Sequence, residues 1–145
     1  MAAVMHECMD ELTVAQAVSL LKSYQISPTQ QRVLVAQVLL TKSQHVSADQ
    51  VMDMVNCYSY KVSKATIYNT LGLFARKGLI RELVIDPAKV FYDTNVAEHH
   101  HFYNVDTGEL TDIEQMDLEV SGLPASPTGT RPVGMDIVVR VRGVA

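Results

Sequence analysis

The chain has few cysteines, no long apolar run and little net charge. Of its 145 residues only Cys8 and Cys57 are cysteines, and they lie far apart without a CxxC pair. We expect free thiols, because two separated thiolates build neither a disulfide framework nor a four-cysteine zinc site within one chain. No apolar run approaches the roughly 20 residues of a membrane span, and the first residues lack a signal-peptide pattern. These absences predict a cytoplasmic protein without a membrane partner.

The composition is that of a folded protein with one ordinary domain or two small ones. Hydrophobic residues make up 48% of the chain and charged residues 19%, so disorder is not expected. The net charge of −4 is unevenly distributed. Residues 1–81 hold eight Lys/Arg against five acids, a net of +3, and residues 82–145 hold four against eleven, a net of −7. A basic first half suits a polyanion such as DNA, although uneven solvated faces are an equally good interpretation of charge alone.

Three segments of the first half carry the same helix-start signal, a Ser or Thr followed three residues later by Gln. The second is reinforced by Pro28, which we expect at the first helical position. Apolar residues recur at helical spacing behind each start, so three short helices are predicted. The three signals are Thr13/Gln16, Ser27/Gln30 and Ser47/Gln50.

A fourth helix is predicted over residues 63–77, with Ser63 as its N-cap. Gly78 follows the helix and suits the left-handed conformation that is common just beyond a helix end. It is entered through the link Tyr60-Lys61-Val62. Two β-prone stretches, 80–85 and 90–92, then form a hairpin. This order fits a helix-turn-helix unit with a β-wing, although such modules also serve as protein-interaction domains.

The second half predicts a smaller unit. Residues 99–105 and 110–113 read as a second hairpin, 114–120 as a short helix, and 136–142 as a last strand after a segment rich in Pro and Gly. About 50 residues with so small a core are marginal alone, so we expect a homodimer. The predicted fold class is α+β, with domains at 1–94 and 95–145.

Four histidines are the best chemical lead: His45, His99, His100 and His101. On a strand, His99 and His101 point to one face and His100 to the other. Imidazole suits zinc, iron, copper and haem iron alike, and nearby acids favour harder cations, so the ion stays open. An exposed histidine run without function is the alternative.

Several dispersed stretches together resemble the ferric uptake regulator family over nearly the whole chain. Within it, the triple histidine resembles the iron response regulator branch. The stretches are Thr29-Gln-Gln-Arg-Val-Leu, His45-Val-Ser-Ala-Asp, Ala65-Thr-Ile-Tyr-Asn-Thr-Leu, Tyr92-Asp-Thr-Asn, and His99-His-His-Phe followed by Asp106-Thr-Gly-Glu-Leu.

The resemblance implies a winged-helix DNA-binding domain, a hinge near Asn95 and a dimerisation domain. It implies an iron- or haem-responsive transcription regulator that binds palindromic, A·T-rich operator DNA as a dimer. Phosphate contacts fix register and base contacts give specificity. The residues expected at the DNA are Arg32, Lys61, Lys64, Thr66, Tyr68 and Asn69.

The resemblance also implies a regulatory metal site between the two domains, with His45, His99 and His101 as ligands. The family's acidic fourth ligand aligns with Tyr92, so Asp93 or water would replace it. A haem or secondary site would retain only Glu98, His100 and Glu119. No structural zinc is expected, because its cysteines align with Asn104 and Thr107.

The ligand and the sign of the response remain open in the sequence. The iron response regulator branch implies haem sensing, with DNA binding when iron is scarce. The Cys-Pro haem motif of some relatives is absent, and His6-Glu7-Cys8-Met9 is only a weak substitute. The alternative within the class is a regulator with iron, manganese or zinc as corepressor. A small metal-dependent hydrolase is the third candidate, but HExxH, nucleophile and Gly-rich phosphate motifs are all missing, so we do not expect an enzyme.

Overall fold

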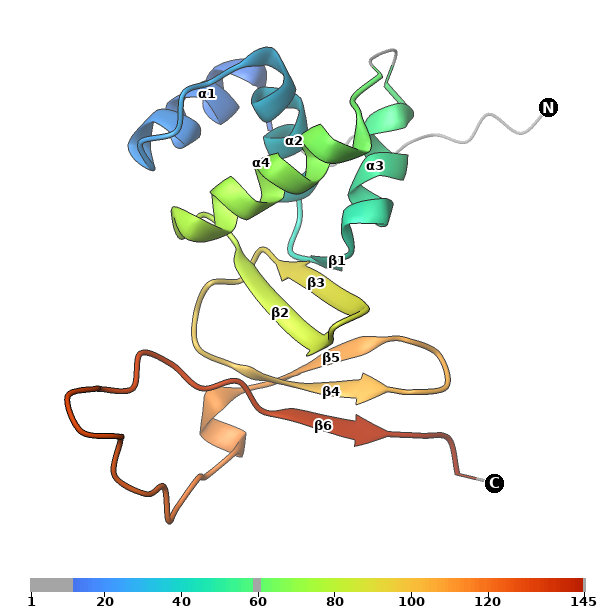
Figure 1. The fold of residues 1–145 in the computed structure, drawn as a ribbon. Helices are drawn as coiled ribbons and strands as arrows, with labels where there is room; N and C mark the ends of the chain where they lie inside the picture. Colours follow the sequence, from blue (N-terminus) through green and yellow to red (C-terminus); the bar gives the residue numbers. More distant parts are fainter. Residues whose placement is uncertain (1–11, 59–60, 145) are drawn as a thin grey trace. The chain divides into compact units, whose positions relative to one another are not determined.

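The computed structural model describes residues 12–58 and 61–144, which form two compact units (Figure 1). Unit 1 extends to Val96 and unit 2 starts at Ala97. The sequence placed this boundary two residues earlier, after residue 94. Thr94 belongs with unit 1 because its N–H donates to the carbonyl of Gln44 (3.2 Å), while its hydroxyl accepts from the N–H of Gln44 (3.0 Å).

Unit 1 begins with four helices, as predicted. Thr13 and Ser47 form capping boxes at two helix starts. Ser63 caps the fourth helix, and Gly78 follows it at φ +81°, a conformation that favours glycine. The helices are α1 (Val14–Ser23), α2 (Gln30–Leu40), α3 (Ala48–Asn56) and α4 (Lys64–Arg76).

The predicted start of α2 is wrong by two residues. Thr29, not Ser27, is the N-cap, and its hydroxyl accepts from the backbone N–H of Arg32 (3.3 Å). Pro28 therefore precedes the cap instead of opening the helix. The Ser27 carbonyl accepts from the N–H of Thr29 (3.0 Å) and from the Arg32 guanidinium (3.1 Å). Sequence spacing alone does not distinguish the two hydroxyl residues, and the hydrogen bond from the Arg32 N–H identifies Thr29 as the cap.

A three-stranded antiparallel sheet completes unit 1. The predicted hairpin is present, with its turn at Pro87 and Ala88 and the Ala88 N–H bound to the Asp86 carboxylate (2.8 Å). The first strand has only two residues and was not predicted from the sequence. The strand order is β1-β3-β2, with β1 (His45–Val46), β2 (Arg81–Asp86) and β3 (Lys89–Asp93).

The hydrophobic core of unit 1 lies between the helices and extends to β3. The predicted core face of α4, with Ile67, Leu71 and Phe74, is fully buried. It packs with buried side chains from α1, α2 and α3. This core fixes the outer face of α4 and the strands that carry His45 and Asp93.

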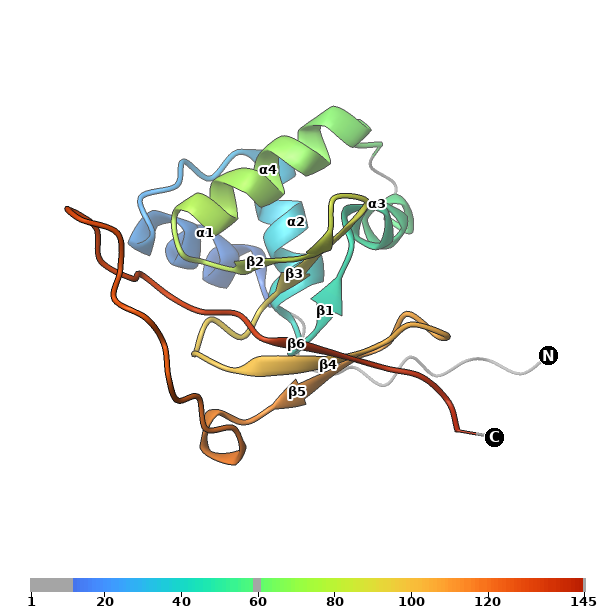
Figure 2. The ribbon, with the colours of Figure 1, turned by 60° about the horizontal axis from the view of Figure 1, so that its bottom comes forward.

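Unit 2 is a small sheet of order β5-β4-β6, in which β6 runs parallel to β4. In place of the helix predicted over 114–120 there is one 3-10 turn, η1 (Gln115–Asp117). A long segment without regular structure connects it to β6 (Figure 2), where prolines and glycines interrupt backbone pairing. The strands are β4 (His100–Asn104), β5 (Leu110–Ile113) and β6 (Val138–Val141).

Among residues 12–58 and 61–144, none of the helices combines the length and apolar character that crossing a bilayer requires.

Candidate metal centre and nucleic-acid interface

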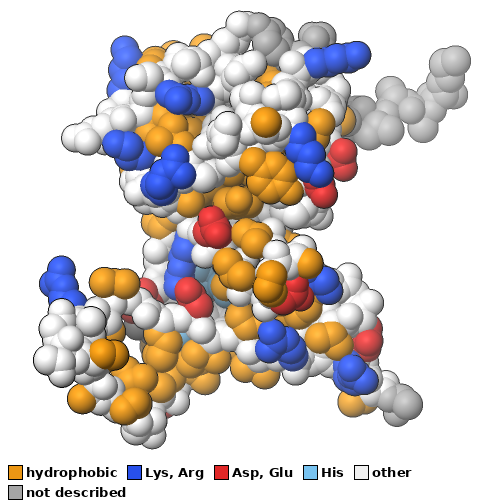
Figure 3. Space-filling model, in the orientation of Figure 1, with side chains coloured by type: hydrophobic (Ala, Val, Ile, Leu, Met, Phe, Trp, Pro, Cys, Tyr) orange, Lys and Arg blue, Asp and Glu red, His pale blue; other side chains and the backbone are white. Residues whose placement is uncertain are grey.

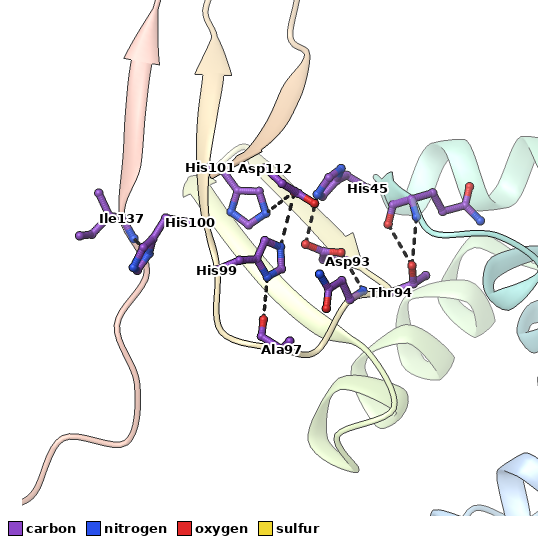
Figure 4. Close-up of polar contacts among 11 residues, drawn as sticks. His45, Asp93, Thr94, Ala97, His99, His100, His101, Asp112 and Ile137 are labelled. Atoms are coloured by element: carbon purple, nitrogen blue, oxygen red, sulfur yellow. Dashed lines mark hydrogen bonds and ion pairs between the residues drawn. The ribbon is translucent and has the colours of Figure 1, made fainter. Parts of the chain in front are cut away.

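Two histidines and one aspartate of unit 2 converge on one face of the β4–β5 hairpin (Figure 4). His101 on β4 is directly opposite Asp112 on β5, and His99 lies two residues before His101, so all three share a face. The Nε2 atoms of His99 and His101 lie 3.5 and 3.4 Å from Oδ1 of Asp112. Their ligand atoms lie within 4.8 Å of one another. The two imidazoles are buried, and these three residues could hold a metal ion.

A backbone contact orients one of these rings. Nδ1 of His99 lies 2.6 Å from the carbonyl oxygen of Ala97. A carbonyl only accepts, so Nδ1 carries the hydrogen and donates it to Ala97, and Nε2 lies toward Asp112. Metal-ligating histidines are commonly oriented in this way by a carbonyl on the second nitrogen. The buried His99 ring thus presents Nε2 to the partly exposed Asp112 carboxylate, and a shared cation could take both as ligands.

Unit 1 brings a second pair together. His45 on β1 is opposite Asp93 on β3, with Nε2 of the histidine 3.2 Å from Oδ2 of the aspartate. Asp93 is 1% exposed, and its other oxygen accepts from the N–H of Asn95 (2.9 Å). A carboxylate so deeply buried requires a compensating charge or hydrogen bonds. The pair is a further imidazole–carboxylate donor set.

Tyr92, which the resemblance aligns with the family's acidic ligand, faces the opposite side of β3 from Asp93. Its side chain belongs to the hydrophobic core of unit 1 and is 6% exposed. Burial raises the pKa of the Tyr92 hydroxyl, and the nearby Glu82 and Tyr68 raise it further, so the phenol is neutral near pH 7. Successive strand residues face opposite sides, so Asp93 takes the side that His45 shares.

His100 faces away from His99 and His101, as strand alternation predicts. Its Nδ1 accepts from the N–H of Ile137 (3.0 Å). His100 and Glu98 line a cavity of about 610 Å³, whose other walls are the loop residues 123–127 and 132–135. Within the described residues, Glu119 joins neither of them in a cluster of three potential ligands. The His6-Glu7-Cys8-Met9 segment lies outside the described residues.

The residues expected at DNA lie on the outer side of α4 and beside it. Lys61 is exposed, while Tyr60 of the predicted link lies outside the described residues. Tyr68 is 46% exposed. Its pocket is lined by the start of α3 and by the β2–β3 hairpin. A separate polar pocket is lined by Thr29, Gln31, Arg32, Thr66, Asn69 and Thr70.

Lysine and arginine side chains outnumber acidic ones over the helices in the face shown in Figure 3. Lys64, at the start of α4, has its Nζ 3.4 Å from Oδ1 of Asp49 and 5.9 Å from the centre of the Tyr68 ring. An exposed aromatic ring with basic neighbours on a helix is suited to contact a nucleic acid.

The fold and these side chains define a winged-helix protein with a cluster of residues that could hold a metal ion. Residues 23–131 match the model of the ferric uptake regulator family. The chain therefore belongs to this family. It is a metal-responsive transcription regulator and not an enzyme, as the sequence predicts.

Individual relatives agree with this assignment. The peroxide operon regulator of Bacillus subtilis strain 168 is 30% identical over 79% of each chain. A peroxide-responsive repressor of Staphylococcus aureus strain Mu50 is 26% identical over 74% of this chain and 73% of its own. The solved ferric uptake regulator of Pseudomonas aeruginosa with manganese has a TM-score of 0.67 and 25% identity, covering 86% of this chain and 96% of the other.

Proposed function

We propose that this chain is an iron-responsive repressor that binds palindromic, A·T-rich operator DNA as a homodimer when a divalent metal ion is bound. The ligands are His45, His99 and His101, joined by Asp93 and Asp112. The observation that carries the proposal is the convergence of two buried imidazoles and a carboxylate on one face of the β4–β5 hairpin.

The two donor sets complement each other. Unit 2 offers two nitrogens and one carboxylate, and unit 1 offers one of each. Neither set alone fills the coordination shell of iron(II) or manganese(II), which take mixed nitrogen and oxygen ligands. A bound ion that takes both sets would supply a bond between the two units.

A divalent ion fits this donor set better than haem. Haem iron already has four ring nitrogens and takes at most two axial ligands. The His99 and His101 ring centres are only 4.5 Å apart, with Asp112 beside both, which favours a small ion. The Pseudomonas aeruginosa relative, with manganese bound, supports the same choice. Haem sensing, which the triple histidine suggested, is the second outcome that the experiment distinguishes.

The residues of each unit have separate tasks in this mechanism. The Ala97 carbonyl orients the ring of His99, and His101 is held in place by its position on β4. His45 and Asp93 lie on β1 and β3 of unit 1, where β3 contacts α3, so their coordination would link the ion to the DNA-binding unit. Fixing the two units relative to each other sets the spacing of the two recognition helices of a dimer. Operator affinity rises because fewer conformations are lost on binding.

At the DNA, we assign phosphate contacts to Arg32, Lys61 and Lys64, and base contacts to Thr66, Tyr68 and Asn69. Arg32, Thr66 and Asn69 already line one polar pocket on unit 1. The Tyr68 ring offers an apolar surface to a thymine methyl group. A palindromic operator requires two such surfaces, so a second copy of the chain is the partner.

We also propose that unit 2 folds without structural zinc. Asn104 and Thr107 stand where relatives carry cysteines, and both close the β4–β5 turn. The Asn104 amide oxygen accepts from the N–H groups of Asp106 (2.9 Å) and Thr107 (3.2 Å). The Thr107 hydroxyl accepts from the N–H of Glu109 (3.3 Å). Hydrogen bonds thus close the turn.

The test is a titration of the purified chain with iron(II), manganese(II) and haem, following absorption and binding to a palindromic A·T-rich duplex. We expect manganese(II) and iron(II) to increase duplex affinity without a Soret band. A Soret band on haem addition, lost when His99 and His101 become alanine, would establish haem as the ligand instead. No duplex binding under any ligand condition would refute the proposed function.

A further inference from the structure

Lys64, the first residue of α4, has two neighbours on unit 1. Its ammonium lies 3.4 Å from the carboxylate of Asp49 on α3 and 5.9 Å from the Tyr68 ring centre. Asp49 and Tyr68 line the same pocket beside the β2–β3 hairpin. One acidic group therefore lies within the basic and aromatic surface to which we assign DNA contact.

The helix dipole stabilises the charge of Asp49 and destabilises the charge of Lys64. The N-terminus of a helix carries a partial positive charge, which stabilises anions and destabilises cations. Asp49 lies in the first turn of α3 and is stabilised there, whereas Lys64 opens α4 and is disfavoured there. Lys64 thus gains more from an external anion than Asp49 gains from a cation. Asp49 supplies that anion in the free protein, and a DNA phosphate can replace it.

We propose that Asp49 is a positioning residue that holds the Lys64 ammonium away from phosphate and so lowers the affinity of the protein for duplex DNA of any sequence. The inference rests on the proposed DNA-binding function. To meet a phosphate, Lys64 leaves Asp49, which then attracts a cation from solution. That cation uptake offsets part of the counterion release that drives binding.

The size of the effect follows from exposure. The Lys64 and Asp49 side chains are 61% and 71% exposed, and exposed ion pairs contribute up to about 1 kcal/mol. Asp49→Asn is therefore expected to tighten duplex binding about two- to fivefold. The plot of log affinity against log salt should become steeper by up to roughly 0.9, the value for one phosphate contact.

The experiment measures fluorescence anisotropy of two labelled duplexes, one palindromic and A·T-rich and one of mixed sequence, over a salt series with manganese(II). Asp49→Asn should tighten both duplexes by the same factor. Asp53→Asn is the matched control, because it removes the same charge from an exposed position one turn along α3. Its binding should stay close to that of the wild type.

A double-mutant cycle shows whether Asp49 acts through Lys64. In a Lys64→Gln background, Asp49→Asn should change affinity by much less than in the wild type. Equal effects in the two backgrounds would overturn the inference, because Asp49 would then repel DNA directly. Unchanged affinity of Asp49→Asn would also overturn it while the proposed function stands. A wild-type protein that binds neither duplex would refute both the inference and the proposed function.

Discussion

Nε2 of His101 lies 3.4 Å from Oδ1 of Asp112, and the two residues are directly opposite each other in the β4–β5 ladder. The same Oδ1 atom lies 3.5 Å from Nε2 of His99, so Asp112 belongs to the same donor set.

Replacing Asp112 by asparagine removes the negative charge of this donor set while keeping its shape. We expect manganese(II) affinity to fall at least about tenfold, because the ion loses an anionic ligand. Isothermal titration calorimetry measures the change. Asp117→Asn, an exposed acid in η1, is the control and should bind as the wild type does. Equal affinities for Asp112→Asn and the wild type would exclude Asp112 as a ligand.

Manganese(II) should raise the melting temperature of the wild-type chain, because the ion binds the folded state. At a concentration one hundred times the dissociation constant, this linkage amounts to about 2.7 kcal/mol. Asp93→Asn should lose most of the increase, since Asp93 is buried beside His45. Differential scanning fluorimetry with and without manganese(II) measures it, with Asp53→Asn as control. A full increase in Asp93→Asn would restrict the site to unit 2.

Tyr68→Ala should weaken operator binding by at least about 1 kcal/mol, or roughly fivefold, through the lost contact with a thymine methyl group. The dimer should remain intact in size-exclusion chromatography. The chain offers a matched control, because Tyr58 of unit 1 is 45% exposed, against 46% for Tyr68. If Tyr58→Ala and Tyr68→Ala bind the operator with the same affinity, Tyr68 makes no specific contact with the DNA.

The start of α2 predicts a difference between two neighbouring hydroxyls. Thr29→Ala should lower the free energy of unfolding by about 1 kcal/mol, because it removes the N-cap. Ser27→Ala should change it by less than about 0.5 kcal/mol, since Ser27 acts through its carbonyl, which alanine retains. Urea unfolding of both variants measures the difference, and the reverse order would place the cap at Ser27.

Treatment with a metal chelator is expected to leave the fold of the chain unchanged, because we propose no structural zinc. After dialysis against a strong chelator, the circular dichroism spectrum and unfolding midpoint should equal those before dialysis, both without added metal. The Asn104 and Thr107 hydrogen bonds, and not a metal, close the β4–β5 turn. Unfolding on chelation, with zinc found in the starting sample by elemental analysis, would show a structural zinc site instead.

Much of unit 1 is predictable because its signals are local. The capping boxes at Thr13 and Ser47 and the apolar spacing in α4 lie within a few residues of each other in the chain. The strand at His45 carries no such signal. It has two residues, and only pairing with β3, far along the chain, makes it a strand.

The role of Asp112 depends on hairpin register, which composition alone does not decide. A turn confined to residues 106–109 would place Glu114 opposite His101. The observed turn starts earlier, because the Asn104 N–H donates to the Glu109 carbonyl (2.9 Å) and the Gly108 N–H to the Asn104 carbonyl (2.8 Å). That shift of two residues brings Asp112 opposite His101. The histidines could be identified from the sequence, but identifying Asp112 as their carboxylate partner requires the strand register.

The central claim is that one ion takes ligands from both units. The most direct measurement is electron spin echo envelope modulation of bound manganese(II), with isotopically labelled histidine, in the wild type and in His45→Ala. The account predicts that the wild type has one more coordinated imidazole nitrogen than His45→Ala, and that operator affinity falls with its loss. Identical modulation in the two proteins would contradict it.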